Sequence, residues 1–332
     1  MVIPNITAMN LITLVKTPES KIKISKLSKI MTIGSCFSEH IGSQLCDVHF
    51  HCHSNPFGTV FNPVSISTLL NRALQNRHFQ AEEIDHHNGR FFNYDLHSSY
   101  DSNQAIITLN KANKAIESVH KSIHELDKLI LTFGTSIGYH HIHNDRLVAN
   151  CHKVPNHNFD RRFLEDDLML SSISQSIDDL LDIRPDLDIL LTVSPVRHTK
   201  EGLVDNNLSK SKLILLCHKI SARYSQATYF PSYEIMMDEL RDYRFYKDDM
   251  IHPTSLAVDI IWKRFMDAFF DDTAVVKVKD FQKLNRAYNH RPFDIKSEGH
   301  ISFCKQQLQE IERMKEKYPE VNFDTYAAHF NL

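Results

Sequence analysis

Short apolar runs recur along the chain, and each of the clearest ones ends at glycine, serine or proline. Four of these runs predict β-strands, at 30–33, 129–133, 189–193 and 227–230. A histidine-rich run at 48–52 predicts one more strand. Strands that alternate with helical stretches are typical of a parallel α/β sheet.

Helical periodicity fills the segments between these runs. A first helix is predicted directly after the first strand, because apolar residues repeat every four positions from Phe37 to Leu45. The pair Asn62-Pro63 has the residue types of an N-cap and a first helical position, which predicts a second helix. Further helices are predicted at 111–127, 162–182, 208–224 and 254–270, and a polar helical tail at 304–317.

These patterns divide the chain into an N-terminal segment (1–24), a main domain (25–270) and a helical C-terminal extension (271–332). For the main domain we expect a three-layer α/β architecture of flavodoxin-like topology, with a parallel sheet between two layers of helices. The extension is expected either to pack on the main domain as an accessory element or to bind a partner.

Length, composition and charge are those of a soluble globular protein. The 332 residues are 42% hydrophobic and 24% charged, and the formal net charge is −3. No strong positive field would therefore recruit nucleic acid or an anionic membrane. No apolar stretch approaches the roughly 20 residues that span a bilayer, and the N-terminus lacks the pattern of a secretory signal. We expect a cytoplasmic protein.

The six cysteines form neither a CxxC pair nor a zinc-like framework, which favours reduced thiols. Cys46 and Cys217 are predicted to be buried, because both lie in apolar runs. His140, His141 and His143 are not expected to bind a metal, because neighbours in an irregular segment need not face one centre. We expect neither a metal nor another cofactor.

Polar residues at strand ends are the candidates for chemistry, because the carboxyl ends of parallel strands form the ligand crevice of an open α/β sheet. Ser35 and Cys36 follow the first strand and begin the first helix. Unpaired N–H groups at a helix start would stabilise a thiolate or a developing oxyanion there. The alternative is a tight turn in which Ser35 only caps the helix.

Asp249 and His252 lie just before the last helix of the main domain. In an Asp-x-x-His turn the carboxylate can fix the tautomer of the imidazole and support the imidazolium formed during proton transfer. With a thiol or hydroxyl nucleophile, these two residues complete the set that acyl transfer needs.

Together these stretches resemble the GSCFA family, which belongs to the larger group of SGNH or GDSL-type hydrolases. The matching stretches are spread over most of residues 30–270. They are GSCFSEHIG (34–42), NPFGTVFNP (55–63), LTFGTS (131–136), NCHKVP (150–155), TVSPVRH (192–198) and YFPSYEIMMDELRDYRFYKDDMIHP (229–253). Ser38 departs from the family name, which has Ala at this position.

The resemblance implies roles for the residues of the first and last SGNH blocks. The Gly-Asp-Ser block aligns without a gap with Gly34-Ser35-Cys36, which favours Cys36 over Ser35 as the nucleophile. The Asp-x-x-His block matches Asp249 as the orienting acid and His252 as the general base.

The two middle blocks imply an oxyanion hole. The glycine of the second block corresponds to Gly58, whose N–H would be one donor. The third block, Gly-x-Asn, reads Gly-Thr-Ser at 134–136, so the usual Asn donor is missing. Ser136, or alternatively Asn150, would take its place.

Four residues in loops near strand ends are candidates for substrate binding: His152, Lys153, Arg197 and His198. Arg197 and Lys153 would supply charge-assisted hydrogen bonds to an anionic or polyhydroxyl substrate. The alternative is ordinary surface polarity, with Arg197 in a structural ion pair.

The sequence thus predicts an SGNH-type hydrolase (esterase) or acyltransferase that acts on an ester or thioester of a small molecule or a saccharide. Cys36 is expected to have a thiol pKa below the free value of about 8.5, because it lies at a helix N-terminus and near His252. The alternative is a non-catalytic carbohydrate- or acyl-group-binding module on the same fold. The acyl donor, the acceptor and the oligomeric state do not follow from the sequence.

Overall fold

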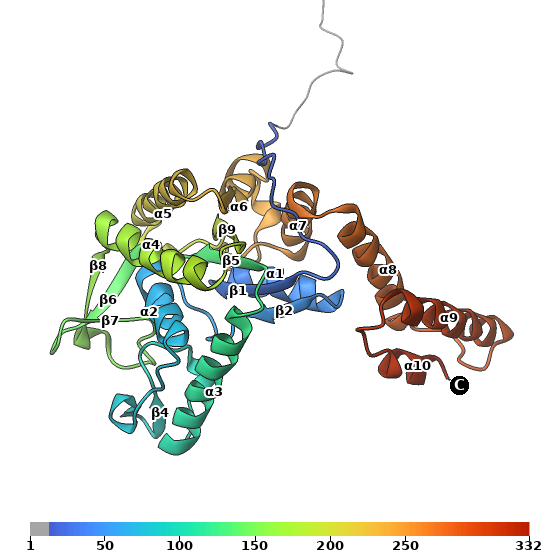
Figure 1. Ribbon diagram of the computed structural model, residues 1–332, viewed down its shortest axis with the longest axis horizontal. Helices are drawn as coiled ribbons and strands as arrows, with labels where there is room; N and C mark the ends of the chain where they lie inside the picture. Colours follow the sequence, from blue (N-terminus) through green and yellow to red (C-terminus); the bar gives the residue numbers. More distant parts are fainter. Residues whose placement is uncertain (1–12, 332) are drawn as a thin grey trace, which may run out of the picture.

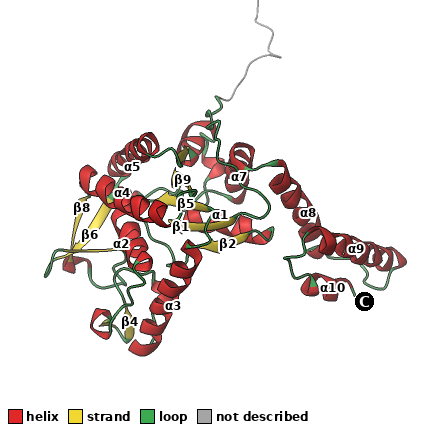
Figure 2. Cartoon of the chain, in the orientation of Figure 1, coloured by secondary structure: helices red, strands yellow, loops and turns green. Residues whose placement is uncertain are grey.

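A five-stranded parallel sheet forms the centre of the protein (Figures 1 and 2). The computed structural model describes residues 13–331, so residues 1–12 of the predicted N-terminal segment lie outside the described part. The strand order is β10-β9-β5-β1-β2, with bounds Ala227–Phe230, Asp188–Val193, Lys128–Phe133, Lys29–Gly34 and His51–Ser54. In chain order this is the 2-1-3-4-5 arrangement of flavodoxin-like folds, which confirms the predicted fold class.

Alternating side chains of the strands enter two apolar cores, one on each face of the sheet. On β1, Met31 and Ile33 belong to the core under four helices, whereas Ile30 belongs to the core under α1 (Cys36–Asp47) and α7 (Ser255–Phe269). The four helices are α2 (Pro63–Leu74), α3 (Ala105–Ile123), α4 (Asp166–Ile183) and α5 (Leu203–Arg223). The main domain therefore has three layers.

The predicted strands and main-domain helices are all present, with shifted bounds. The strand expected at 48–52 begins at His51, and α3 begins at Ala105 rather than at 111. Asn62 caps α2 as predicted, because its Oδ1 accepts the N–H of Ser65 at 2.8 Å. Short elements complete the list: η2 (Ala81–Glu83), η3 (Ser98–Tyr100), η4 (Asn156–Asn158), η5 (Thr199–Glu201), α6 (Ser232–Glu234), η6 (Ile235–Glu239) and η7 (Tyr243–Phe245).

Two antiparallel insertions were not predicted. A hairpin of β3 (Asp85–His87) and β4 (Arg90–Phe92) follows η2. A sheet of β6 (Ile137–His141), β7 (Arg146–Val148) and β8 (Phe159–Phe163) follows β5. These strands are rich in His, Arg and Asp and lack a clean apolar alternation, so their sequences resemble loops.

The C-terminal extension consists of α8 (Asp272–Tyr288), α9 (Glu298–Lys317) and α10 (Asp324–Phe330), which form the lobe at the right of Figure 1. Its apolar residues continue the core under α1 and α7. Polar bonds reinforce the contact: Asn285 donates to the carbonyl oxygen of Asp47 at 2.7 Å. The predicted tail is therefore the end of α9 within a packed helical lobe. No helix in the described range 13–331 is long and apolar enough to cross a membrane.

The end of β1 comes unusually close to its neighbour β5. A Cβ on Gly34 would lie 2.1 Å from the carbonyl oxygen of Thr132, and Gly34 has a φ of +147°. The next residue, Ser35, donates its N–H to the same carbonyl at 3.1 Å. Only glycine fits at this position. The close approach to β5 determines where the chain leaves the sheet and α1 begins.

We expect Gly34→Ala to destabilise the fold by about 2–5 kcal/mol, because the new methyl group meets rigid backbone and the φ is strained. Urea denaturation followed by circular dichroism would measure the loss. Gly299→Ala is the matched control, since a Cβ there meets nothing within 4 Å, and it should be neutral or slightly stabilising. Equal urea midpoints for the two variants would contradict this account.

Candidate active site

The turn between β1 and α1 gives Ser35 and Cys36 different environments. Ser35 is 1% exposed, and its Oγ accepts the N–H of Phe37 at 3.3 Å, so it caps the helix. Cys36 is the first residue of α1 and is half-buried. The thiol is therefore the more accessible of the two candidate nucleophiles.

The surroundings of Cys36 do not favour a thiolate. Burial raises the pKa of the Cys36 thiol, and the carboxylate of Glu39, one turn further along α1, raises it again. The backbone N–H of Cys36 and a hydrogen bond with Thr59 lower the pKa only in part. The expected low pKa was wrong: the helix N-terminus is outweighed by burial and by Glu39. A base is needed to activate this thiol.

The Asp249 carboxylate is held ready to orient His252. Its Oδ1 accepts the N–H groups of Ile251 and His252 at 2.8 and 2.9 Å, and its Oδ2 lies 2.7 Å from Nδ1 of His252. The backbone hydrogen bond from His252 and the contact with its ring keep the pKa of Asp249 well below its usual range. An ionised Asp249 only accepts, so Nδ1 carries the proton and Nε2 is left as the base.

Arg197 holds the turn that presents His252. Its guanidinium donates to the carbonyl oxygen of Met250 from Nε at 3.1 Å and from Nη2 at 2.5 Å, and it lies over the ring of Tyr246. Its backbone N–H donates to Ile251. These donors hold the turn that carries His252, which favours a positioning role; the substrate contact predicted for Arg197 stays a prediction.

His252 lies on the carboxyl side of β9, because the N–H of Arg197, which follows this strand, donates to the carbonyl oxygen of Ile251. Burial is the main cause that lowers the pKa values of His40 in α1 and His198 after β9, and the charge of His252 contributes to both shifts. Among the described residues no hydrogen bond joins His252 to Cys36. Proton transfer between them requires the imidazole and the thiol to come within hydrogen-bond reach, directly or through a water.

His198 is not set up to bind an anionic substrate. Burial, then Lys210 and His252, lower its pKa to about 3, so the ring is neutral. The ring also packs edge-on against Phe61. Its Nε2 is buried without a hydrogen-bond partner among the described residues, and the predicted substrate contact stays a prediction.

Two of the three predicted oxyanion donors, Gly58 and Ser136, are already bonded within the protein. Gly58 donates its N–H to the carbonyl oxygen of Asn55 at 2.7 Å. Ser136 is fully buried, and both its N–H and its hydroxyl contact the Oγ of Ser209. Asn150 accepts the N–H of His152 with its side-chain oxygen and lines a cavity with His152 and Lys153, apart from Cys36. The geometry does not favour these three residues as oxyanion donors, and the assignments stay predictions.

Two backbone N–H groups beside the thiol remain free of hydrogen bonds to other residues in the described part of the chain. They belong to Cys36, the first residue of α1, and to Thr59, the residue after Gly58. Thr59 also contacts the Cys36 thiol through its hydroxyl. These N–H groups replace the predicted donors as candidates for an oxyanion hole.

Two residues that sequence reasoning missed shape the carboxyl edge. Asn55 accepts the N–H of Gly34 at 3.0 Å and donates to the carbonyl oxygen of Ser35 at 3.5 Å. Lys210 is 1% exposed and donates to the carbonyl oxygens of Gly134 and Ser194, which ties the ends of β5 and β9. Burial lowers the pKa of Lys210 to about 7.

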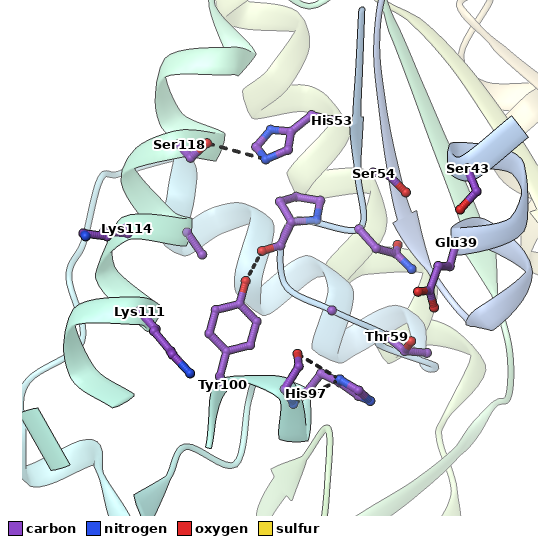
Figure 3. Close-up of a pocket in the computed structure, with 15 residues that line it drawn as sticks. Glu39, Ser43, His53, Ser54, Thr59, His97, Tyr100, Lys111, Lys114 and Ser118 are labelled. Atoms are coloured by element: carbon purple, nitrogen blue, oxygen red, sulfur yellow. Dashed lines mark hydrogen bonds between the residues drawn. The ribbon is translucent and has the colours of Figure 1, made fainter. Parts of the chain in front are cut away.

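A cavity of about 640 Å³ lies between α1 and α3 and is drawn in Figure 3; Cys36 and His252 are not among the residues that line it. Glu39 and Thr59, which both act on the Cys36 thiol, form part of its wall. The opposite wall is α3, which contributes Lys111 and Lys114. The remaining lining is mostly polar: Ser43, His53, Ser54, Asn55, His97, Ser99, Tyr100 and Ser118.

His152 and Lys153 lie in a separate cavity of about 440 Å³ with Asn150 and Asp101. The Nδ1 of His152 lies 3.0 Å from the Asp101 carboxylate, and the ring stacks on Phe92. The turn at 97–101 contributes residues to both cavities, so it stands between them. The predicted substrate residues of this loop are therefore not brought to the thiol.

The described part of the chain contains no cluster of three or more His, Cys, Asp or Glu side chains arranged for a metal ion. Fold and site together define a three-layer α/β protein with a cysteine, a histidine and an aspartate at the carboxyl edge of its sheet. The chain belongs to the GSCFA family, whose pattern matches residues 29–265. The C-terminal domain of GSCFA domain proteins matches residues 281–332.

Solved structures with a similar fold are distant in sequence. One is a protein from Streptococcus pneumonia provisionally described as a platelet activating factor, with 12% identity, a TM-score of 0.37, and coverage of 72% of this chain and 84% of the other. Another is a carbohydrate esterase family 3 protein from Talaromyces cellulolyticus, with 9% identity, a TM-score of 0.36, and coverage of 76% and 99%. No match was found among curated proteins.

The pH dependence of Cys36 alkylation tests the electrostatics of the site. We expect the rate with iodoacetamide, read by peptide mass spectrometry, to reach half its maximum above the ordinary thiol pKa, because burial and Glu39 raise the pKa of Cys36. Glu39→Gln should shift the midpoint to lower pH. The shift should shrink in 1 M salt, since Glu39 is exposed. An unchanged midpoint in Glu39→Gln would show that burial alone sets the pKa.

Proposed function

We propose that this protein is a hydrolase or acyltransferase that moves an acyl group from an ester or thioester through Cys36. The observation that carries the proposal is the Asp249–His252 pair, joined at 2.7 Å, in a chain whose accessible thiol begins α1. Ser35 is used as the helix cap, which leaves Cys36 as the nucleophile.

In the proposed reaction His252 removes the proton of the Cys36 thiol as the sulfur attacks the acyl carbonyl carbon. The bond between the carbonyl carbon and the leaving oxygen or sulfur then breaks, and His252 returns the proton to the leaving group. The acyl group remains on Cys36 as a thioester. Water or an acceptor hydroxyl or amine attacks this thioester next, with His252 as the base, and the thiol is regenerated. Asp249 stabilises the imidazolium in both halves.

The N–H groups of Cys36 and Thr59 are the proposed oxyanion donors. The first lies at the N-terminus of α1, where the helix dipole favours negative charge. The second belongs to the residue whose hydroxyl contacts the thiol. Two donors close to the nucleophile are what a tetrahedral intermediate needs.

The cavity of Figure 3 is the proposed substrate site. Its many hydroxyl and amide groups suit a polyhydroxyl substrate such as a saccharide ester. Lys111 and Lys114 form no ion pair in the described part of the chain, and they stand on the wall opposite Glu39. They favour a substrate that carries a carboxylate or phosphate at a distance from the ester.

Mutation separates the two candidate nucleophiles. With 4-nitrophenyl acetate we expect Cys36→Ala to abolish the acyl-enzyme adduct mapped at this position by mass spectrometry, and Ser35→Ala to leave most of it. His252→Gln should slow acylation by about 10²- to 10⁴-fold. Ser35→Ala should instead lower the stability by about 1 kcal/mol through loss of the cap.

An adduct retained in Cys36→Ala but lost in Ser35→Ala would show that Ser35, not Cys36, is the nucleophile. No adduct in the wild type would favour a binding module.

The lysines on α3 should select for charged substrates. We expect Lys111→Gln/Lys114→Gln to lower kcat/KM for 4-nitrophenyl hemisuccinate by about 2- to 10-fold relative to 4-nitrophenyl butyrate, the range for two exposed charge contacts. Lys121→Gln, on the same helix but outside the cavity, is the matched control. Equal losses for both esters would exclude charge recognition at this wall.

A further inference from the structure

Cys46 and Cys52 lie next to each other at the turn between α1 and β2. Cys46 is in the last turn of α1 and Cys52 is the second residue of the edge strand β2. The Sγ of Cys46 lies 3.7 Å from the carbonyl oxygen of Cys52. The two side chains are close enough for each to perturb the pKa of the other. They are six positions apart in the sequence, and the reversal of the chain at 48–50 brings them together.

The exposure of the pair suits a reaction with a small molecule. Cys46 is exposed, although its apolar surroundings in the sequence predicted a buried residue, and Cys52 is half-buried. Of the other thiols, Cys217 and Cys304 are buried and Cys36 begins the opposite end of the same helix.

Position and exposure make Cys46 the reactive member, since it is exposed at the helix end while Cys52 is half-buried on the strand. The proximity of the two thiols lowers the pKa of Cys46 to about 7 and raises the pKa of Cys52. A lowered pKa favours the thiolate, the form that attacks disulfides. Cys52 is held within reach as the thiol that resolves the product.

We propose that Cys46 and Cys52 form a reversible disulfide, so that the α1–β2 turn is a site of oxidation by small-molecule disulfides such as oxidised glutathione. The Cys46 thiolate attacks one sulfur of the oxidant, which breaks its S–S bond and releases one glutathione thiolate. Cys52 then loses its proton to solvent and attacks the Sγ of Cys46, which expels the second glutathione. Two protein thiols are oxidised, and one disulfide is reduced to two thiols.

The disulfide would close the turn on which the C-terminal lobe rests. Between the two cysteines, the carbonyl oxygen of Asp47 accepts from Asn285, and the Nε2 of His49 lies 2.9 Å from the hydroxyl of Tyr326. Oxidation would therefore fix the shape of the surface that α8 and α10 contact. Neither the formation of this disulfide nor its influence on the C-terminal lobe depends on acyl transfer at Cys36.

Peptide mapping of the full chain tests the proposal directly. The protein is treated with oxidised glutathione at pH 7.5, its free thiols are blocked with iodoacetamide, and it is cut after Glu and Asp. Cleavage after Glu39 and Asp47 puts Cys36, Cys46 and Cys52 on three different peptides. We expect peptide 40–47 linked to the peptide that starts at residue 48, two hydrogen masses below the sum of the two. Dithiothreitol should reverse the link.

Single substitutions assign the roles of the two thiols. Cys52→Ser should leave Cys46 as a stable mixed disulfide with glutathione, whereas Cys46→Ser should leave Cys52 largely alkylated. Cys304→Ser, which removes a buried thiol, should not change the link. Melting curves for each variant would verify that it is folded. Three results with the wild-type protein would overturn the proposal. They are glutathione that accumulates on Cys46 while Cys52 stays free, a link from Cys46 to a different cysteine, and a pair that stays fully reduced.

Discussion

At the end of β1 the backbone passes so close to β5 that a Cβ on Gly34 would lie 2.1 Å from the carbonyl oxygen of Thr132. That carbonyl accepts the N–H of Ser35, and the N–H of Gly34 is taken by Asn55. The backbone N–H groups of both turn residues are thus bonded to a neighbouring strand or loop, which restrains the turn. The first residue of α1, Cys36, consequently has a fixed place relative to the sheet, and every other part of the site is arranged around it.

The electrostatics at this place favour a neutral thiol over a thiolate. Burial and the nearby carboxylate of Glu39 raise the pKa of Cys36 more than the helix N-terminus lowers it. A resting thiol is protected from oxidation and becomes a nucleophile only when a base takes its proton. His252 is suited to be this base, because the Asp249 carboxylate accepts the proton on Nδ1 and leaves Nε2 free to take up another. The same helix thus has a protected thiol at its start and, at Cys46, a reactive one at its end.

How far the sequence predicts the structure depends on what each residue contacts. Strands such as 129–133 were predicted because a buried parallel strand must be apolar along its length. Asp249 and His252 were predicted because their contact spans only one turn of chain. The antiparallel β6–β8 sheet was missed, because its partly exposed strands tolerate His and Arg. Cys46 was wrongly predicted to be buried, because an apolar neighbourhood in the sequence does not say which side of a helix end faces solvent.

The bonding of Ser136, one of the expected oxyanion donors, follows from a general constraint on the loops at this edge. At the carboxyl edge of a parallel sheet the loops reverse direction, and their backbone groups must find partners away from the strands. Lys210 satisfies the carbonyl oxygens at the ends of β5 and β9, and Ser209, its neighbour on α5, satisfies Ser136. A polar residue after a strand can therefore serve the scaffold as readily as a substrate, and only the long-range contact decides which. Because α5 supplies the partners of Gly134 and Ser136 from more than 70 positions away, no local pattern in the sequence could have revealed them.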